Sequence, residues 1–366
     1  GRPGVAYQAR QLGLAFNAVL GIIMSLFLSL GAGTILSGVG VADALMQPAK
    51  TYLQIVGGFC ILNALIPICS SYLRAFGFSK EPLYASIIGN VINFCLNAFF
   101  LFVLHKGVAG VATATVISRI INLVIVVLLG AVLVKAKQHP ERESNRAVMG
   151  QIIRIGLPSA CETAIYNVSM TLVIRFLNQM DAQGLNVTAR SYTMQITNFS
   201  YCVGAALAQA NAIMTGWHIG AKEYDACDRG TRKAAIIGVI VAVILETMFA
   251  LCSGWIMQLF SKDPQMVSLV GKLLAIDIVL EMGRVTNLVY GQALKTSGDA
   301  VFPVVMGACF MILCSVGGTY LFGIRLGLLA VGAYIGMAGD ECVRAVGMYL
   351  RWKSGKWKEK GLVKSR

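Results

Sequence analysis

The sequence predicts an all-α polytopic membrane protein built as a two-lobed helical bundle. Of its 366 residues, 57% are hydrophobic and only 13% are charged, and the mean hydropathy is +0.71. That composition leaves too little polar surface for a water-soluble globule. Apolar runs long enough to cross a bilayer recur along the whole chain, and a polar turn in the first half has a copy in the second half.

Ten apolar runs of about 20 residues or more predict ten transmembrane helices. They lie near 11–33, 49–75, 83–104, 107–134, 150–177, 186–217, 233–260, 267–294, 301–323 and 327–350. A polar, basic stretch separates the fourth run from the fifth. We therefore divide the chain into an N-terminal lobe (1–134), a cytoplasmic linker (135–149), a C-terminal lobe (150–352) and a basic cytoplasmic tail (353–366).

The two lobes are related by an internal repeat. Residues 74–82 (RAFGFSKEP) and 295–303 (KTSGDAVFP) share a basic residue, a glycine and a proline at a common shift of 221, which is 295 minus 74. Farther on, 107–111 (GVAGV) lines up with 327–331 (GLLAV) at a shift of 220. Many transporters are built from two such repeats with the substrate path between them.

The net charge of +14 is better explained by membrane topology than by binding to nucleic acid. With the N-terminus inside, most Lys and Arg residues fall on one side of the membrane, as the positive-inside rule requires. We expect a multi-pass monomer in the plasma membrane, with both termini cytoplasmic, whose partners are the lipid bilayer and a small-molecule substrate and not nucleic acid. None of the ten cysteines forms a C-x-x-C pair, so we expect small buried hydrophobes and not metal ligands.

Ionisable residues inside the apolar runs of the second lobe predict a functional site, because such residues are costly in a membrane and usually face a partner or a watery cavity. Glu281 and Arg284 are neighbours on one helix face, and Asn287 extends that stripe by a turn. The pair serves either as a structural contact between helices or as a proton-responsive pair.

Two other spans of this lobe carry candidate residues. Glu162 lies near mid-span, with Tyr166 at i+4, and we expect Glu162 to compete for Arg284. On the last span Asp340 can pair with Arg344 at i+4, toward the inner half of the helix.

The apolar runs of the first lobe contain no acids and carry amide and hydroxyl side chains in their place. Asn93 and Asn97 recur on one helix face, and Thr115 lies on the next helix. They serve either to pack helices together or to coordinate an ion. Arg119 is the one charge deep in that lobe.

Several stretches give the chain a resemblance to the multidrug and toxic compound extrusion (MATE) transporters. They are GVAGVATATVIS (107–118), IGLPSACETAIYN (155–167) and LKTSGDAVFP (294–303). Their order and spacing, together with the internal repeat, are similar to those of the family. The resemblance implies twelve helices in two six-helix lobes. This chain lines up from the third helix onward, so we expect the first two helices to be missing.

The same resemblance implies a cation-coupled antiporter that exports amphiphilic, cationic drugs or metabolites by alternating access, with H⁺ or Na⁺ as coupling ion and no other cofactor. Asn93 and Thr115 fit the family's first-lobe ion site, whereas Asn97 occupies the position of its Asp. A flippase for a lipid-linked substrate is the alternative, for which only Arg119 and Arg284 offer cations. We do not expect an enzyme, because D-D-x-x-D, H-E-x-x-H and G-x-S-x-G motifs are absent from the sequence.

Overall fold

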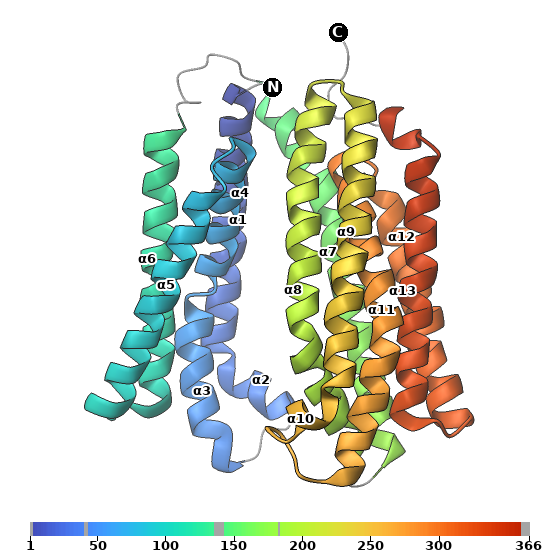
Figure 1. Cartoon of the computed structure of the whole chain (residues 1–366). Coiled ribbons are helices and arrows are strands. Elements are labelled where there is room, and N and C mark those ends of the chain that lie inside the picture. Colours follow the sequence, from blue (N-terminus) through green and yellow to red (C-terminus); the bar gives the residue numbers. More distant parts are fainter. Residues whose placement is uncertain (1–2, 40–42, 135–142, 182–183, 360–366) are drawn as a thin grey trace. The chain divides into compact units, whose positions relative to one another are not determined.

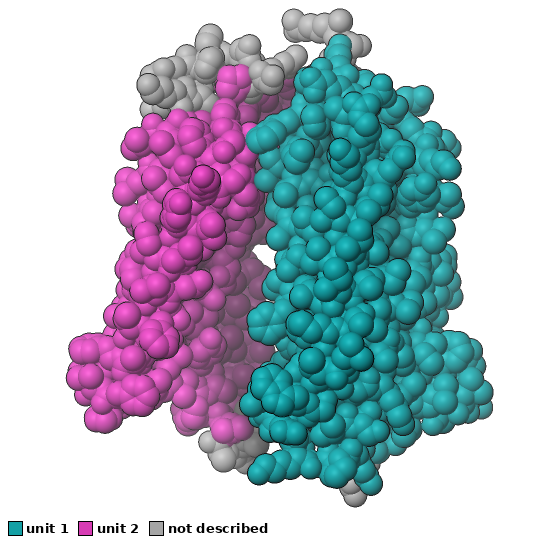
Figure 2. Space-filling view, viewed as in Figure 1, with its two compact units in different colours: residues 1, 153–366 teal, residues 2–152 magenta. Residues whose placement is uncertain are grey.

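A computed structural model describes residues 3–39, 43–134, 143–181 and 184–359 of the chain (Figure 1). These residues fold into helices, and no strand occurs among them. The helical bundle divides into two compact units, residues 2–152 and residues 153–366, which Figure 2 colours separately. The predicted all-α architecture with two lobes is therefore confirmed.

The first unit contains four helical rods in its described part, of which the second is bent and the third ends in a π-helical turn. Its elements are α1 (Pro3–Leu30), α2 (Ala32–Val39), α3 (Asp43–Gly58), α4 (Ile61–Ala75), α5 (Lys80–Ala98), η1 (Phe99–Val103) and α6 (Gly107–Leu133). The bend between α3 and α4 is 41°. Buried Gln8 joins the start of this unit to its end, because its side-chain amide donates to the Glu143 carbonyl at 2.7 Å.

The second unit contains six helical rods in its described part. Its elements are α7 (Asn145–Met180), α8 (Leu185–Gly220), α9 (Tyr224–Leu251), α10 (Ser253–Met257), α11 (Pro264–Thr296), α12 (Val301–Phe310), η3 (Met311–Val316), η4 (Thr319–Arg325), α13 (Leu329–Lys353) and η5 (Lys356–Glu359). Helix α11 is the central rod, because it packs against α8, α9 and α13. Its buried Leu273, Leu280 and Val289 belong to the core clusters of this unit.

Both units show the surface of a membrane protein. Five described helices are long and apolar enough to cross a bilayer, or six if the bent α3 and α4 form one span. The remaining long rods, α7, α8, α11 and α13, are more polar and carry Glu162, Arg190, Glu281 and Arg344 respectively. Large apolar side chains stand out from the bundle, with Phe102 77% and Leu251 82% exposed. Soluble proteins rarely expose apolar surface on this scale, so lipid is its natural neighbour.

The first repeated turn is the same structure in both units. Gly77 and Gly298 both adopt left-handed backbone conformations, with φ of 90° and 94°. After each helix the chain closes with the same bonds: Phe78 N–H donates to the Leu73 carbonyl at 3.1 Å, and Asp299 N–H donates to the Leu294 carbonyl at 2.9 Å. Glycine is favoured there because a Cβ is unfavourable at such φ values.

The second repeated turn is also conserved in backbone, but at a shift of 222 and not 220. Leu104 N–H donates to the Phe99 carbonyl at 3.1 Å, and Leu326 N–H donates to the Leu321 carbonyl at 3.0 Å. The alignment of Gly107 with Gly327 is therefore wrong by two residues. The left-handed residue after the turn is His105 in one unit and Gly327 in the other, so matching glycine to glycine misplaced the register.

The boundaries of the predicted linker and tail lie partly outside the described residues, which omit 135–142 and 360–366. Residues 145–149 of the expected linker already belong to α7, and the two units divide between residues 152 and 153. The described part of the tail turns back on the bundle, since Trp357 is 1% exposed and stacks on Trp352 with ring centroids 4.1 Å apart.

Candidate functional site

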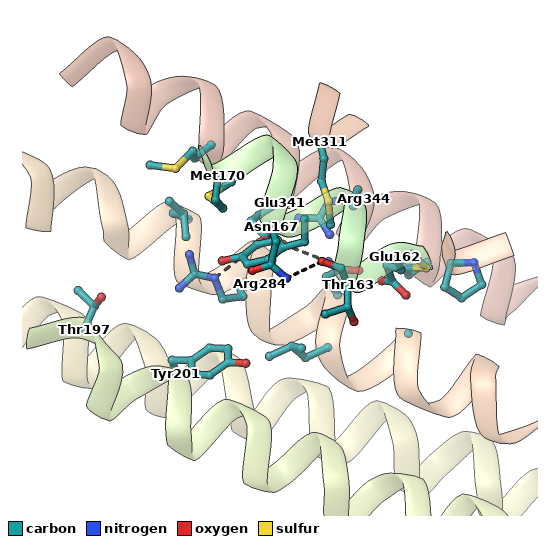
Figure 3. A pocket seen from close by; sticks show the side chains of 18 of the residues that line it. Glu162, Thr163, Asn167, Met170, Thr197, Tyr201, Arg284, Met311, Glu341 and Arg344 are labelled. Carbon is teal, nitrogen blue, oxygen red and sulfur yellow. Dashed lines mark hydrogen bonds and ion pairs between the residues drawn. The ribbon is translucent and has the colours of Figure 1, made fainter. Parts of the chain in front are cut away.

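A cavity of about 710 Å³ lies within the second unit, lined by residues of α7, α8, α11 and α13 and of the segment that follows α11. Figure 3 shows Glu162, Thr163, Asn167 and Met170 from α7, Thr197 and Tyr201 from α8, Arg284 from α11, Met311 from η3, and Glu341 and Arg344 from α13 around this space. Predicted residues Tyr166 and Asn287 also line it. The size suits a drug-sized molecule.

Arg284 is the centre of the charge network in this cavity. Its Nη1 lies 2.8 Å from Glu281 Oε2, and its Nε lies 3.6 Å from Glu341 Oε1. The Asn287 side-chain amide donates to Glu341 Oε2 at 3.1 Å. The pair of Glu281 and Arg284 predicted from their spacing is therefore present, and a second acid from α13 shares the guanidinium.

Close packing of α11 against α13 makes this sharing possible. A Cβ on Gly283 would lie 2.8 Å from both Cys342 N and the carbonyl carbon of Glu341, distances that real side chains do not tolerate. Glycine at this position therefore lets the two backbones approach, as small residues do at membrane helix interfaces. The approach brings Glu341 within reach of Arg284.

Arg344 forms the second charge cluster, adjacent to the first. Its Nε lies 2.8 Å from Asp340 Oδ1, as the i, i+4 spacing predicted, and its Nη2 lies 2.9 Å from Glu341 Oε1. Asp340 also accepts a hydrogen bond from the Ser315 hydroxyl at 2.9 Å. Glu341 thus bridges Arg284 and Arg344, so a change at one cluster is felt at the other.

Glu162 does not compete for Arg284, contrary to our expectation. Its Oε2 lies 2.6 Å from Lys295 Nζ, and both side chains are about one-fifth exposed, at 19% and 18%. Lys295 lies in the last turn of α11, directly before the repeated turn. The sequence alone shows Lys295 only as the basic residue of that repeated turn. The chain folds so that this turn reaches the α7 side of the cavity.

Two buried acids have no ion pair among the residues that the structure describes. Glu246 on α9 is 0% exposed, and Ser200 lies beside a carboxyl that forms no close hydrogen bond within the described part of the chain. Asp277 on α11 is 2% exposed, lines the cavity, and its Oδ2 has no partner. Burying a charged group without a partner is costly, which sets these two acids apart from the ion-paired acids described above.

The first-lobe candidates form a neutral chain of hydrogen bonds within their own unit. Asn97 donates to Asn93 Oδ1 at 3.0 Å, and Asn93 donates to the Ser118 hydroxyl at 3.3 Å. Thr115 donates to the Val111 carbonyl at 2.9 Å. The network joins α5 to α6, which is the packing role considered for these amides.

This network has a counterpart in the second unit. Asn93 and Ser118 are 25 residues apart, and so are Ser315 and Asp340, which form the equivalent hydrogen bond at a shift of 222. The shift is the one that relates the second pair of repeated turns. One joint between helices is therefore built twice, with neutral groups in the first unit and with a carboxylate in the second.

The sequence missed Glu341, Arg344, Lys295 and Arg190 as members of the cavity. The signal for the α13 residues was present, because Asp340, Glu341 and Arg344 lie within two helical turns. The links of Glu341 to Arg284 and of Glu162 to Lys295 depend on tertiary packing, which spacing along one helix does not reveal.

The chain is similar to a known protein family and to several of its members. The model described as MatE matches residues 1–99 and 158–321. The "Uncharacterized transporter YisQ" of Bacillus subtilis (strain 168) is 32% identical over 364 residues, which span 98% of this chain and 80% of that protein. The "Probable multidrug resistance protein NorM" of Thermotoga maritima is 22% identical, covering 93% of this chain and 76% of the relative.

Solved structures agree on the fold. The crystal structure of MATE in the straight conformation superposes with a TM-score of 0.85 at 18% identity, covering 98% of this chain and 84% of that one. The eukaryotic MATE transporter AtDTX14 superposes with a TM-score of 0.86 at 18% identity, covering 98% and 82%. With the helical bundle, the family model and the relatives in agreement, the chain belongs to the MatE family of membrane transporters and is not an enzyme.

Proposed function

We propose that this protein is a cation-coupled antiporter that exports amphiphilic drugs or metabolites, with H⁺ or Na⁺ as the coupling ion. The observation that carries the proposal is the position of Arg284, held between Glu281 and Glu341 at the wall of a drug-sized cavity. Relatives named as multidrug resistance proteins support the export of drugs.

Coupling follows from the shared guanidinium. A cation that binds Glu281 or Glu341 competes with Arg284 for the same carboxylate. Neutralising Glu341 removes the acid of α13 that Arg284 of α11 contacts, so the contact between the two helices weakens, whereas neutralising Glu281 frees Arg284 for Glu341. A ligand shifts a conformational equilibrium only by binding two states differently, and this competition supplies such a difference. Alternating access then exchanges the cation for the substrate.

The remaining features of the proposal concern the setting. We place the protein in the plasma membrane, in a bacterium the inner membrane, as a multi-pass monomer with both termini cytoplasmic, because its basic residues concentrate on that side. The expectation that two preceding helices complete the first lobe stays a prediction.

Efflux measurements test this function. The protein is expressed from its complete gene in cells that lack their main efflux pumps, and accumulation of fluorescent amphiphilic cations is followed. We expect lower accumulation than in cells with empty vector, and restored accumulation when the proton and sodium gradients are collapsed. Unchanged accumulation across a broad panel of dyes would contradict drug export.

A flippase for a lipid-linked amphiphile is the second candidate, and the cavity favours it more than the sequence did. Four cationic side chains line the cavity, namely Arg190, Arg284, Lys295 and Arg344. The sequence analysis named only Arg119 and Arg284 as cations for such a substrate. Arg119 belongs to the first unit and does not line this cavity, whereas Arg190, Lys295 and Arg344 do. Gradient-independent movement of a fluorescent phospholipid across proteoliposomes would support this candidate over antiport.

A further inference from the structure

Arg190 is a buried cation that forms no ion pair with the described residues. It lies near the start of α8, lines the cavity and is only 7% exposed. Its Nη2 donates to the Met170 sulfur at 3.7 Å, and its Nε has no partner. No carboxylate lies within ion-pair distance of Arg190 among the residues for which positions are described. Thr193, one turn away, donates to the Ala189 carbonyl of its own helix.

This arrangement is unusual within the same cavity. Arg284 and Arg344 each lie near two carboxylates, and Lys295 has Glu162. A buried charge without a partner destabilises a protein. A guanidinium that is held in this state beside a drug-sized cavity is suited to a partner that arrives from outside the chain.

We propose that Arg190 binds the carboxylate of an amphiphilic substrate, and that zwitterions and organic anions therefore belong to the substrates of this transporter. Arg is the residue best suited to this task, since its planar fork donates two parallel hydrogen bonds to a carboxylate. Met170, Met194 and Met337 line the same cavity, and their flexible thioethers adapt to apolar bodies of different shape. The inference rests on the proposed export of amphiphiles and names their polar group.

Pairing inside the chain is the competing explanation. Asp277 lines the same cavity without an ion pair, so another conformation could join it to Arg190. In that case Arg190 would serve the conformational cycle, and a substrate carboxylate would gain nothing from it. The experiment must therefore compare substrates that differ only in the carboxylate.

Tetramethylrhodamine, which has a free carboxylate, and its ethyl ester, which has none, form such a pair of probes. Binding to purified protein in nanodiscs is followed by fluorescence anisotropy. We expect Arg190→Gln to weaken binding of the acid about 10- to 100-fold, the loss of a hydrogen-bonded charge pair, and to change binding of the ester less than twofold. Arg190→Lys should recover part of the acid binding, because it keeps the charge without the fork.

Arg175→Gln is the matched control, because Arg175 lies exposed on α7 and does not line the cavity. It should bind both probes as the wild type does. The acid should also raise the melting temperature of wild-type and Asp277→Asn protein, but not of Arg190→Gln. Equal weakening of acid and ester by Arg190→Gln, or no weakening, would overturn the proposal, as would loss of the acid's effect in Asp277→Asn.

The outcomes also separate this inference from the proposed function. Wild-type protein that binds and exports the ester but does not bind the acid leaves the exporter intact and overturns the anion site. Arg190-dependent binding of the acid without export in cells would support the site and contradict the exporter. Binding of neither probe would overturn the inference.

Discussion

Glu281 Oε2 lies 2.8 Å from Arg284 Nη1 in an ion pair of unequal access, since the Glu281 side chain is 0% exposed and the Arg284 side chain is 25% exposed. Arg284 lines the cavity, whereas Glu281 lies behind it. A cation that moves from the cavity to Glu281 must therefore displace or pass the guanidinium. In the antiport proposed above, Arg284 is therefore the residue that both the coupling ion and the substrate would contact.

The first prediction separates a coupling pair from a structural pair. Glu281→Gln leaves a guanidinium that has lost its closest acid, at a cost of about 3–5 kcal/mol, so this variant should lose both stability and transport. Glu281→Gln combined with Arg284→Gln should recover stability, because Glu341 keeps Arg344 at 2.9 Å. Thermal melts and dye efflux are measured on both. Gradient-driven export by the double variant would show that the pair serves packing alone.

A second prediction concerns Glu162 and Lys295. Each single replacement, Glu162→Gln or Lys295→Gln, should destabilise the protein by more than the roughly 1 kcal/mol of an exposed pair but by less than the loss of Glu281, because the two side chains are about one-fifth exposed. The exchange Glu162→Lys with Lys295→Glu should restore the stability. Double-mutant cycles from thermal melts give the coupling energy, and a value near zero would contradict the pair.

Gly283 provides a third prediction about the approach of α11 to α13. Gly283→Ala should destabilise by about 1–3 kcal/mol, because its Cβ would lie 2.8 Å from backbone atoms of α13. Gly230→Ala on α9 is the control. Nothing lies within 4 Å of its Cβ, so the change should be stabilising by up to about 1 kcal/mol. Chemical or thermal unfolding measures both, and a tolerant Gly283 would mean that the helices have room to separate.

The fourth prediction is a pH dependence at the loop between α7 and α8. Burial alone would raise the pKa of Asp181, but hydrogen bonds from Asn186 and Leu185 to its carboxylate outweigh it, and the pKa lies below its usual 3.8. A lowered folded pKa means that this contribution to stability is complete above the unfolded pKa and is lost as pH falls through the folded value. Wild-type protein should therefore lose stability as the pH falls below about 4.

Asp181→Ala removes that contribution at every pH. It should lower the melting temperature at pH 7, as loss of a helix cap does at about 0.5–2 kcal/mol, and flatten the decline below pH 4. Melts between pH 3 and pH 7 check both effects. Equal slopes for wild type and variant below pH 4 would show that other acids account for the decline.

The sequence was sufficient for the helical rods and for contacts within a helix. All ten apolar runs coincide with helical rods of the described chain, and five or six of these rods are apolar enough to cross a membrane. The length and hydrophobicity of such rods can be read directly from the sequence. The pairs of Glu281 with Arg284 and of Asp340 with Arg344 follow from turns of one helix. Such predictions require only that the helix forms.

Contacts between helices could not be predicted from the sequence, because they depend on how the helices pack. Which acid shares Arg284 depends on how closely α13 approaches α11, and that depends on Gly283, which the sequence does not distinguish from the other 38 of its 39 glycines. In the sequence Lys295 appears only as the basic residue of a polar turn, which gives no sign of its pairing with Glu162. Lys295 reaches Glu162 of α7 only because the helices pack together, which the sequence does not show.

The joint between helices occurs in two copies that can be compared directly: Asn93 with Ser118, and Ser315 with Asp340. The first copy shows that a hydroxyl and an amide suffice to tie two such helices together, so adhesion does not require an acid at this place. The carboxylate of the second copy, with Arg344 one turn beyond it, adds an ion pair to the same joint, whereas the first copy is built from neutral groups. Duplication thus lets one joint stay neutral while its counterpart carries charge, within the same backbone frame.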